Sequence, residues 1–207
     1  MQKSSLTYYN TAKLSVMDGP WAHEILHQKS IFPEHVSERT FLCETAWVIL
    51  NSGFRETVVR KLFPYVSLCF FDWRCAELIA TDRENAIRLS ANAFRNVQKL
   101  TAIADVATLV SAEGFAAYWE RVRKTPIENL QKLPFIGPIT VMHLAKNLGF
   151  AVSKPDRHLV RLAKQLGYDC PMLLCRDIST ESGDTEDVVD AVLWRFQASH
   201  APYLNSH

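Results

Sequence analysis

Helical periodicity runs through most of this 207-residue sequence and is the feature that most restricts its fold. Between residues 92 and 111, apolar residues recur at steps of three and four, which places them along one side of a helix. The segment FLCETAWVIL, residues 41–50, would be apolar on most sides, as expected of a buried central helix. Alternation with a period of two does not persist in any segment. The sequence therefore predicts an all-α protein of roughly ten helices.

The charge balance and the cysteines exclude some classes of protein. The chain has 23 Lys and Arg against 22 Asp and Glu, a net charge of +1, which argues against a histone-like binder that relies on total charge. Five cysteines, none in Cys-x-x-Cys spacing, favour reduced, buried thiols over a zinc or redox site. Since no signal-peptide core and no run of membrane-spanning length occurs, we expect a soluble, cytoplasmic protein.

A tight turn followed by a lone acid stands out in the segment LQKLPFIGPITVMHLAKNLGFAVSKPDRHLVRLA, residues 130–163. Pro134 ends one helix, and Pro138 suits the first position of the next, which Gly149 would cap in a left-handed conformation. Gly137 can take a positive φ or let another backbone approach closely. The free N–H groups at the start of the second helix would bind an anion, for which a nucleic-acid phosphate is the obvious candidate. The alternative is an ordinary packing element with a solvated turn.

The turn, LPFIGPIT, resembles the helix-hairpin-helix signature Leu-Pro-Gly-x-Gly-x-x-Thr, and KPDRHLVRLA resembles the segment that follows it in the DNA glycosylase superfamily typified by endonuclease III. A weaker likeness joins NAFRNVQKLTAIADVA and GFAAYWERV to the middle helices of 3-methyladenine glycosylase I. The resemblance implies contacts with double-stranded DNA from the hairpin, from the loop after residues 41–51 and from the segment after the acid. The residues concerned are Pro134, Phe135, Ile136, Gly137, Ile139, Thr140, Phe54, Arg55 and His158.

The sequence departs from the superfamily pattern at three points. Phe135 replaces the first glycine, so the turn is either built differently or carries an apolar side chain towards DNA. Ile139 stands where bifunctional members have their Schiff-base lysine, and Lys154 lies on the wrong side of Asp156 to replace it. No four-cysteine cluster follows Asp156, so we expect no iron–sulfur cluster and no metal site, although a monovalent cation at the hairpin is compatible with the resemblance.

Asp156 is the candidate catalytic residue. Breaking the bond between deoxyribose and a base develops positive charge on the sugar, which a nearby carboxylate stabilises while it orients a water molecule. Without an amine nucleophile the product would be an abasic site, so the sequence predicts a monofunctional glycosylase of base excision repair. The simpler interpretation of Asp156 is an N-cap for residues 157–166, and the two roles are compatible because a cap fixes the position of the carboxylate.

Reaching a base in a duplex requires flipping it into a pocket. Glu44, Trp47 and Asn51 lie at positions i, i+3 and i+7 of a predicted helix and are candidates for that pocket, although Trp47 could equally belong to the core. Phe54 or Arg55 would be the wedge that fills the gap. Further candidates for phosphate contacts are Arg95, Lys99 and Lys146.

The resemblance also divides the chain into two helical subdomains with a cleft between them. Residues 1–39 and 150–207 would form a bundle of terminal helices that carries Asp156, and residues 40–149 a six-helix, barrel-like bundle that ends in the hairpin. We expect a monomer. Two alternatives remain: a non-catalytic helix-hairpin-helix DNA-binding module, and a relative that modifies an unusual base rather than excising it. An aromatic pocket would suit alkylated purines, but uracil, mispaired thymine and oxidised bases stay open.

Overall fold

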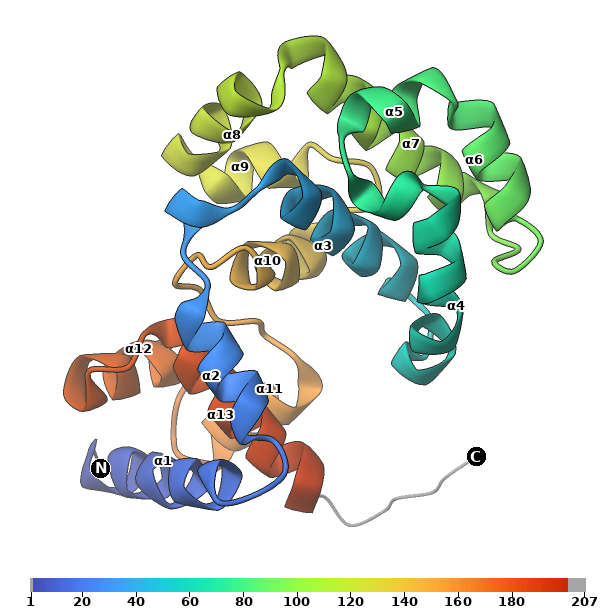
Figure 1. Cartoon of the computed structure of the whole chain (residues 1–207). Coiled ribbons are helices and arrows are strands. Elements are labelled where there is room, and N and C mark those ends of the chain that lie inside the picture. Colours follow the sequence, from blue (N-terminus) through green and yellow to red (C-terminus); the bar gives the residue numbers. More distant parts are fainter. Residues whose placement is uncertain (1, 201–207) are drawn as a thin grey trace. The chain divides into compact units, whose positions relative to one another are not determined.

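The computed structural model describes residues 2–200 of the chain and the side chains of residues 5–199. This part contains thirteen α-helices and two short 3-10 helices, with no β-strand among the described residues (Figure 1). The predicted all-α class is confirmed. The helices exceed the ten or so that periodicity predicts because several have only six to eight residues, too short to show a repeat.

The chain divides into two compact units, residues 1–32 with 149–207, and residues 33–148. The first boundary therefore lies seven residues earlier than the sequence predicted, and Gly149 belongs to the first unit. Residues 33–39 belong to the second unit because the Trp119 indole donates a hydrogen bond of 2.8 Å to the Pro33 carbonyl. The Glu38 carboxylate adds a 2.6 Å bond from the Ala76 N–H.

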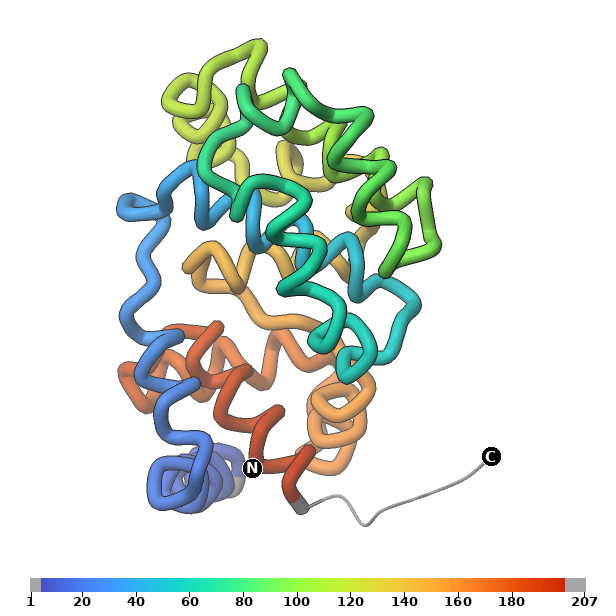
Figure 2. The backbone as a smooth tube through the Cα atoms, turned by 45° about the vertical axis from the view of Figure 1, so that its right-hand side comes forward, coloured from blue at the N-terminus to red at the C-terminus, as the bar shows by residue number. Residues whose placement is uncertain are grey.

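The first unit contains helices from residues 2–30 and 157–200, which lie side by side in Figure 2. Their buried side chains form one core. Tyr9, Ile25, Leu162 and Val189 are among its fully buried side chains. Its helices are α1 (Gln2–Met17), α2 (Ala22–Ser30), α11 (Arg157–Gln165), α12 (Pro171–Ser182) and α13 (Glu186–His200).

The second unit is built around α3 and α7, which pack against each other. Ser37 caps α3, since its hydroxyl accepts a 3.1 Å bond from the Thr40 N–H. The elements of this unit are η1 (Pro33–His35), α3 (Glu38–Asn51), α4 (Glu56–Cys69), η2 (Phe71–Trp73), α5 (Ala76–Thr81), α6 (Arg83–Ser90), α7 (Val97–Glu113), α8 (Phe115–Lys124), α9 (Pro126–Gln131) and α10 (Pro138–Asn147).

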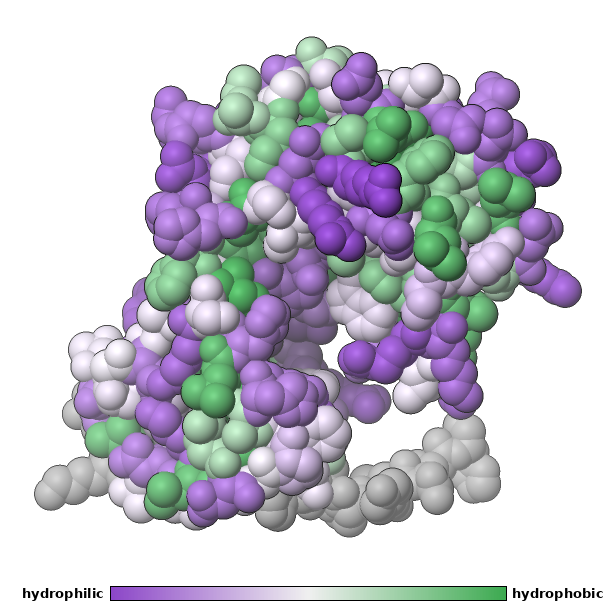
Figure 3. Space-filling view, in the orientation of Figure 1, coloured by the Kyte–Doolittle hydropathy of each residue, from purple (hydrophilic) through white to green (hydrophobic). Residues whose placement is uncertain are grey.

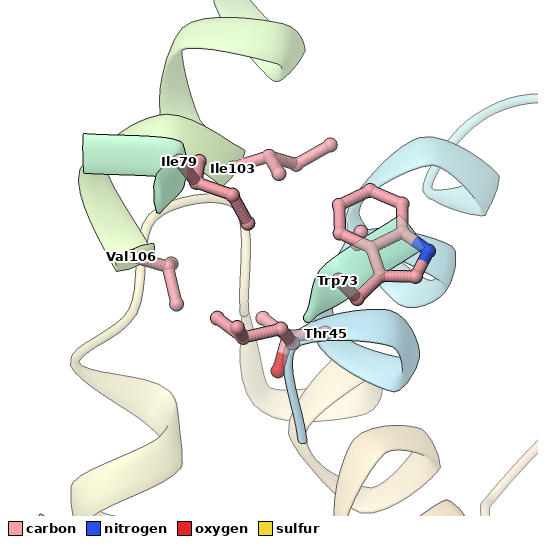
Figure 4. Close-up of a pocket in the computed structure, with 7 residues that line it drawn as sticks. Thr45, Trp73, Ile79, Ile103 and Val106 are labelled. Atoms are coloured by element: carbon pink, nitrogen blue, oxygen red, sulfur yellow. The ribbon is translucent and has the colours of Figure 1, made fainter. Parts of the chain in front are cut away.

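A small void lies in the interior of the second unit, between α3, η2, α5 and α7 (Figure 4). Thr45, Trp73 and Ile103 are among its lining residues, and it has no room for a water molecule. It is a packing defect rather than a ligand site. The outer surface is mixed, with hydrophobic residues interspersed among hydrophilic ones on the face that Figure 3 shows.

No single helix among the described residues is long and apolar enough to cross a membrane. α7 and α8 would reach that length only together, and they are bent by 102° at the break between them. All five cysteines are free thiols, but only Cys175 is fully buried, so the predicted burial of the other four is wrong.

Gly149 ends α10 with a φ of +83°, the left-handed conformation predicted for it. A Cβ atom at this position would also lie 2.7 Å from the Ile31 carbonyl oxygen, a contact that no side chain can make. Gly183, at the end of α12, has a similar φ of +76° but nothing within 4 Å of its Cβ position. Substitutions at the two glycines therefore allow the cost of backbone strain to be measured separately from the cost of steric clash.

We expect Gly149→Ala to lower the free energy of unfolding by about 2–4 kcal/mol, because strain and clash add. Gly183→Ala should cost about 1–2 kcal/mol from strain alone. Urea unfolding of both variants measures the difference. Equal losses would show that the first unit relaxes around Ile31.

A half-buried carboxylate ties together three segments of the first unit. Asp184 accepts hydrogen bonds from the Tyr9 hydroxyl at 2.5 Å, the Lys13 ammonium at 2.5 Å and the Lys29 ammonium at 2.7 Å. Burial raises the pKa of Asp184, but these three bonds lower it by more, to about 2. The folded state therefore holds this proton less tightly than the unfolded chain does, and Asp184 stabilises the fold at pH values above about 4.

This stabilisation should disappear as the pH falls from about 4 through 2. Asp184→Asn should lower the free energy of unfolding at pH 7 by about 2 kcal/mol and flatten its dependence on pH in that acid range. Thermal unfolding between pH 2 and pH 7 measures both effects. An unchanged acid slope in the variant would contradict the assignment.

Candidate functional site

The predicted hairpin is formed by α9, α10 and the turn between them. Leu133 and Ile136 are buried and fix the turn on the second unit. The Gly137 N–H donates to the Thr140 hydroxyl at 2.6 Å, which closes the first turn of α10. Gly137 has an ordinary φ of −90°, and a Cβ atom there would meet only the Thr140 hydroxyl, at 3.8 Å. The positive φ considered for Gly137 is therefore wrong.

The start of α10 exposes hydrogen-bond donors. The backbone N–H groups of Ile139 and Thr140 donate to no backbone carbonyl within the described chain. Pro134, Phe135 and Ile139 are exposed beside them, whereas the Ile136 side chain is only 4% exposed. This arrangement fits an anion held by the two amides. Ile136 has to be removed from the side chains predicted to contact DNA, because it belongs to the core.

Phe135 takes the conformation that a glycine would take. Its φ is +60°, a left-handed conformation that costs a residue with a Cβ atom about 1–2 kcal/mol. The sequence left two alternatives for this turn: a different construction, or an apolar side chain directed outward. Because the backbone keeps the conformation of a glycine, it fits the second alternative. The residue is 42% exposed.

Lys99 lies beneath the Phe135 ring, and its environment differs from the one that the sequence predicted. The residue is only 3% exposed, so the predicted phosphate contact is wrong. Its ammonium donates to the carbonyls of Ile49, Leu50 and Ser52, where α3 ends and has unpaired acceptors. Burial lowers the pKa of Lys99 to about 8.

The same ammonium lies 5.0 Å from the ring centre of Phe54 and 5.7 Å from that of Phe135, both within cation–π range. Phe54 also packs on Phe94, with ring centres 5.1 Å apart. Lys99 therefore connects the end of α3, the predicted wedge loop and the hairpin turn. Its partners lie up to fifty positions away, and nothing in the local sequence indicates them.

Asp156 caps α11, as the simpler interpretation predicted. Its Oδ1 accepts hydrogen bonds from the backbone N–H groups of His158 at 2.9 Å and Leu159 at 3.0 Å. Its Oδ2 makes no hydrogen bond within the described chain, and the residue is half-buried. One oxygen thus fixes the carboxylate while the other is available to a ligand. The His158 backbone N–H takes part in this cap, and the predicted contact of His158 with DNA stays a prediction.

The loop before Asp156 is held by a second carboxylate that the sequence analysis missed. Asp190 of α13 is only 1% exposed, and its Oδ2 accepts a 2.6 Å bond from the Lys154 N–H. The Ser153 hydroxyl, in the same loop, is buried without a partner among the described residues. The sequence signal that could have identified Asp190 is the position of an acid among the apolar residues of the segment EDVVDAVLW.

The predicted base-pocket residues share one face of α3 but already have partners in the second unit. Glu44 accepts a 2.8 Å bond from the Asn147 amide. Trp47 packs edge-on against Phe63, with ring centres 5.1 Å apart. Asn51 donates to the Trp47 carbonyl, and its Oδ1 is buried without a partner among the described residues.

The predicted wedge loop follows α3. Phe54 is 42% exposed, and Arg55 is an exposed residue directly before α4. An open hollow of about 490 Å³ lies beside Phe54 and is also lined by Arg95 and Val97. Among the described residues, no three His, Cys, Asp or Glu side chains are placed to bind a metal ion together.

Comparison with solved structures gives a likeness to the 8-oxoguanine glycosylase/lyase of Methanocaldococcus jannaschii, solved in complex with a 15mer DNA containing 8-oxoguanine. The TM-score is 0.58 at 17% sequence identity, and the match covers 91% of this chain and 96% of the other. No family model and no curated protein sequence matches the chain. The predicted likeness to the helix-hairpin-helix DNA glycosylases is confirmed at the level of the fold.

Replacing Lys99 by methionine should lower the free energy of unfolding by about 2–3 kcal/mol, because buried carbonyls at the end of α3 lose their donor. Lys124→Met, at an exposed position, should stay within about 0.5 kcal/mol of the unmodified protein. Urea unfolding tests both. A Lys99→Met variant as stable as the Lys124→Met control would show that water replaces the ammonium.

Proposed function

We propose that this protein is a monofunctional DNA glycosylase that hydrolyses the bond between deoxyribose and a damaged or mispaired base. The observation that carries the proposal is that the two carboxylate oxygens of Asp156 differ in their hydrogen bonds. Oδ1 is fixed by two backbone N–H groups, and Oδ2 makes no bond within the described chain. The shared fold with a glycosylase/lyase supports the same class of reaction.

In the proposed reaction, the base leaves and positive charge develops on the sugar. The fixed Asp156 carboxylate lowers the energy of that charge without having to reorganise, and Oδ2 accepts a hydrogen bond from the attacking water. The bond from the base nitrogen to the anomeric carbon breaks with its electron pair staying on the nitrogen, and a bond from the water oxygen to that carbon forms. The proton that the water loses is taken up by Asp156 Oδ2 and returned through solvent to the released base. Asp190 contributes by fixing the loop that leads to Asp156.

The residues at the hairpin support the proposal of hydrolysis rather than lyase chemistry. A lyase needs an amine that attacks the sugar carbon. Ile139 supplies none, and its exposed side chain offers only apolar contact. The proposed reaction therefore leaves an abasic site and an intact strand.

Double-stranded DNA is the proposed ligand of the hairpin. The Ile139 and Thr140 amides would hold one phosphate, with the neighbouring turn against the minor groove. A monovalent cation could accompany that phosphate. We propose that the protein acts as a monomer. We also propose that it has no iron–sulfur cluster, because no four-cysteine cluster follows Asp156.

The face of α3 that carries Glu44, Trp47 and Asn51 is the proposed wall for the flipped base. Trp47 has Phe63 on one side and the Arg60 guanidinium 5.3 Å from its ring centre. Stacking on Trp47 would require Arg60 to move. The Asn51 Oδ1 is buried without a partner among the described residues, so a base N–H could bond to it only after the side chain becomes accessible.

Asp156→Asn tests the proposal. The amide oxygen can still accept the two N–H groups of α11, so stability should change little. The amide cannot neutralise a sugar cation, so base release should fall at least about 100-fold while the affinity for duplex DNA is kept. The measurement is excision from a panel of duplexes that contain alkylated, oxidised, deaminated or mispaired bases, followed by alkali to reveal abasic sites.

Three outcomes bear on the proposal. Undiminished release by the Asn variant would remove Asp156 from the chemistry. Binding without release from any substrate would favour the non-catalytic module. Strand cleavage without alkali, with an adduct trapped by borohydride, would refute the monofunctional reaction. Mass spectrometry of the product distinguishes excision from modification of the base.

A further inference from the structure

We propose that Phe54 and Phe135 form a platform on which unpaired nucleobases stack, so that the second unit binds single-stranded DNA. The inference deepens the proposed function by naming a second form of DNA that the hairpin surface accepts. It concerns binding by the second unit and not the chemistry at Asp156, so the two can fail separately.

The conformation of Phe135 is the first support. A glycine at a φ of +60° would be free of strain, yet the chain places a phenylalanine there and leaves the residue 42% exposed. Backbone strain of this kind persists where the surrounding structure enforces it, and it is concentrated at functional sites. Burial in a core does not explain the strain here, because much of the ring faces solvent.

The way the two rings are held is the second support. Both ring centres lie within 6 Å of the Lys99 ammonium, which three carbonyls fix in turn. Phe54 is braced further by Phe94, which is only 2% exposed. Rings that are already immobile lose little entropy when a base stacks on them, and stacking suits every base because each has a π-face.

The charge around the platform selects a polyanion as the occupant. Arg55, which follows Phe54, and Arg95 are exposed basic residues, whereas Lys99 is buried and Lys132 is paired with Glu128 at 2.8 Å. Arg95 lines the hollow beside Phe54 and has no ion pair among the described residues. A second copy of the same surface would be repelled, and an apolar protein partner would leave these charges unmatched.

Single strands fit the platform better than a duplex does. In a paired duplex the faces of the bases are stacked on one another, and exposing one costs a few kcal/mol. Unpaired bases present their faces freely, and their phosphates can reach Arg95 and the Ile139 and Thr140 amides. Aromatic rings beside cations and free amides are the combination that single-stranded DNA recognition uses.

Phe135→Gly is the decisive variant because glycine suits the left-handed backbone and should not lower the midpoint of thermal unfolding. We expect it to weaken the binding of a fluorescent 15-nucleotide oligothymidine roughly tenfold in a fluorescence polarisation titration. Phe54→Leu should weaken binding by a similar factor. Tyr65→Leu, at a residue of α4 that is also 42% exposed but outside the platform, should bind as the unmodified protein does.

A probe with the same phosphates and no bases separates stacking from charge. The unmodified protein should bind a 15-unit abasic tetrahydrofuran oligomer roughly tenfold less tightly than oligothymidine, and Phe135→Gly should not weaken that binding further. Equal affinity for the two probes, or full oligothymidine binding by Phe135→Gly, would overturn the platform. Asp156→Asn should bind oligothymidine normally, so a failure of excision leaves this result unaffected.

Discussion

The candidate active site depends on two hydrogen bonds to one oxygen. The His158 and Leu159 N–H groups both donate to Asp156 Oδ1. They start α11 and at the same time fix the direction of the second carboxylate oxygen. Through the bond from the Lys154 N–H to Asp190, the same loop is tied to α13 and to the core of the first unit. A carboxylate held in this way is a structural cap and a preorganised charge together, so the two interpretations of Asp156 describe one arrangement.

Lys99 has the corresponding role in the second unit. One buried ammonium satisfies the end of α3 and supports the rings of the loop and of the hairpin turn. It explains why this hairpin accommodates a phenylalanine at the position of the superfamily's first glycine. The backbone keeps the left-handed conformation, and the side chain gains a cation to pack on. The change therefore adds an aromatic surface while the hairpin is retained.

What the sequence predicted correctly was local. The all-helical class, the cap at Asp156 and the left-handed Gly149 each depend on a few neighbouring residues. What it missed depends on contacts between distant segments. The partners of Lys99 lie 47 to 50 positions away in sequence. The pocket of α3, the cleft between the subdomains and the wedge stay predictions, because placing them requires bound DNA.

The most direct test of the central claim is a comparison of two abasic-site analogues in duplex DNA, one with a cationic pyrrolidine and one with a neutral tetrahydrofuran ring. A carboxylate preorganised for a sugar cation should bind the cationic analogue at least about tenfold more tightly. The preference should vanish in Asp156→Asn while the affinity for the neutral analogue is kept. Equal affinities for the two analogues in the unmodified protein, or the same preference in the variant, would contradict the claim that Asp156 stabilises charge on the sugar.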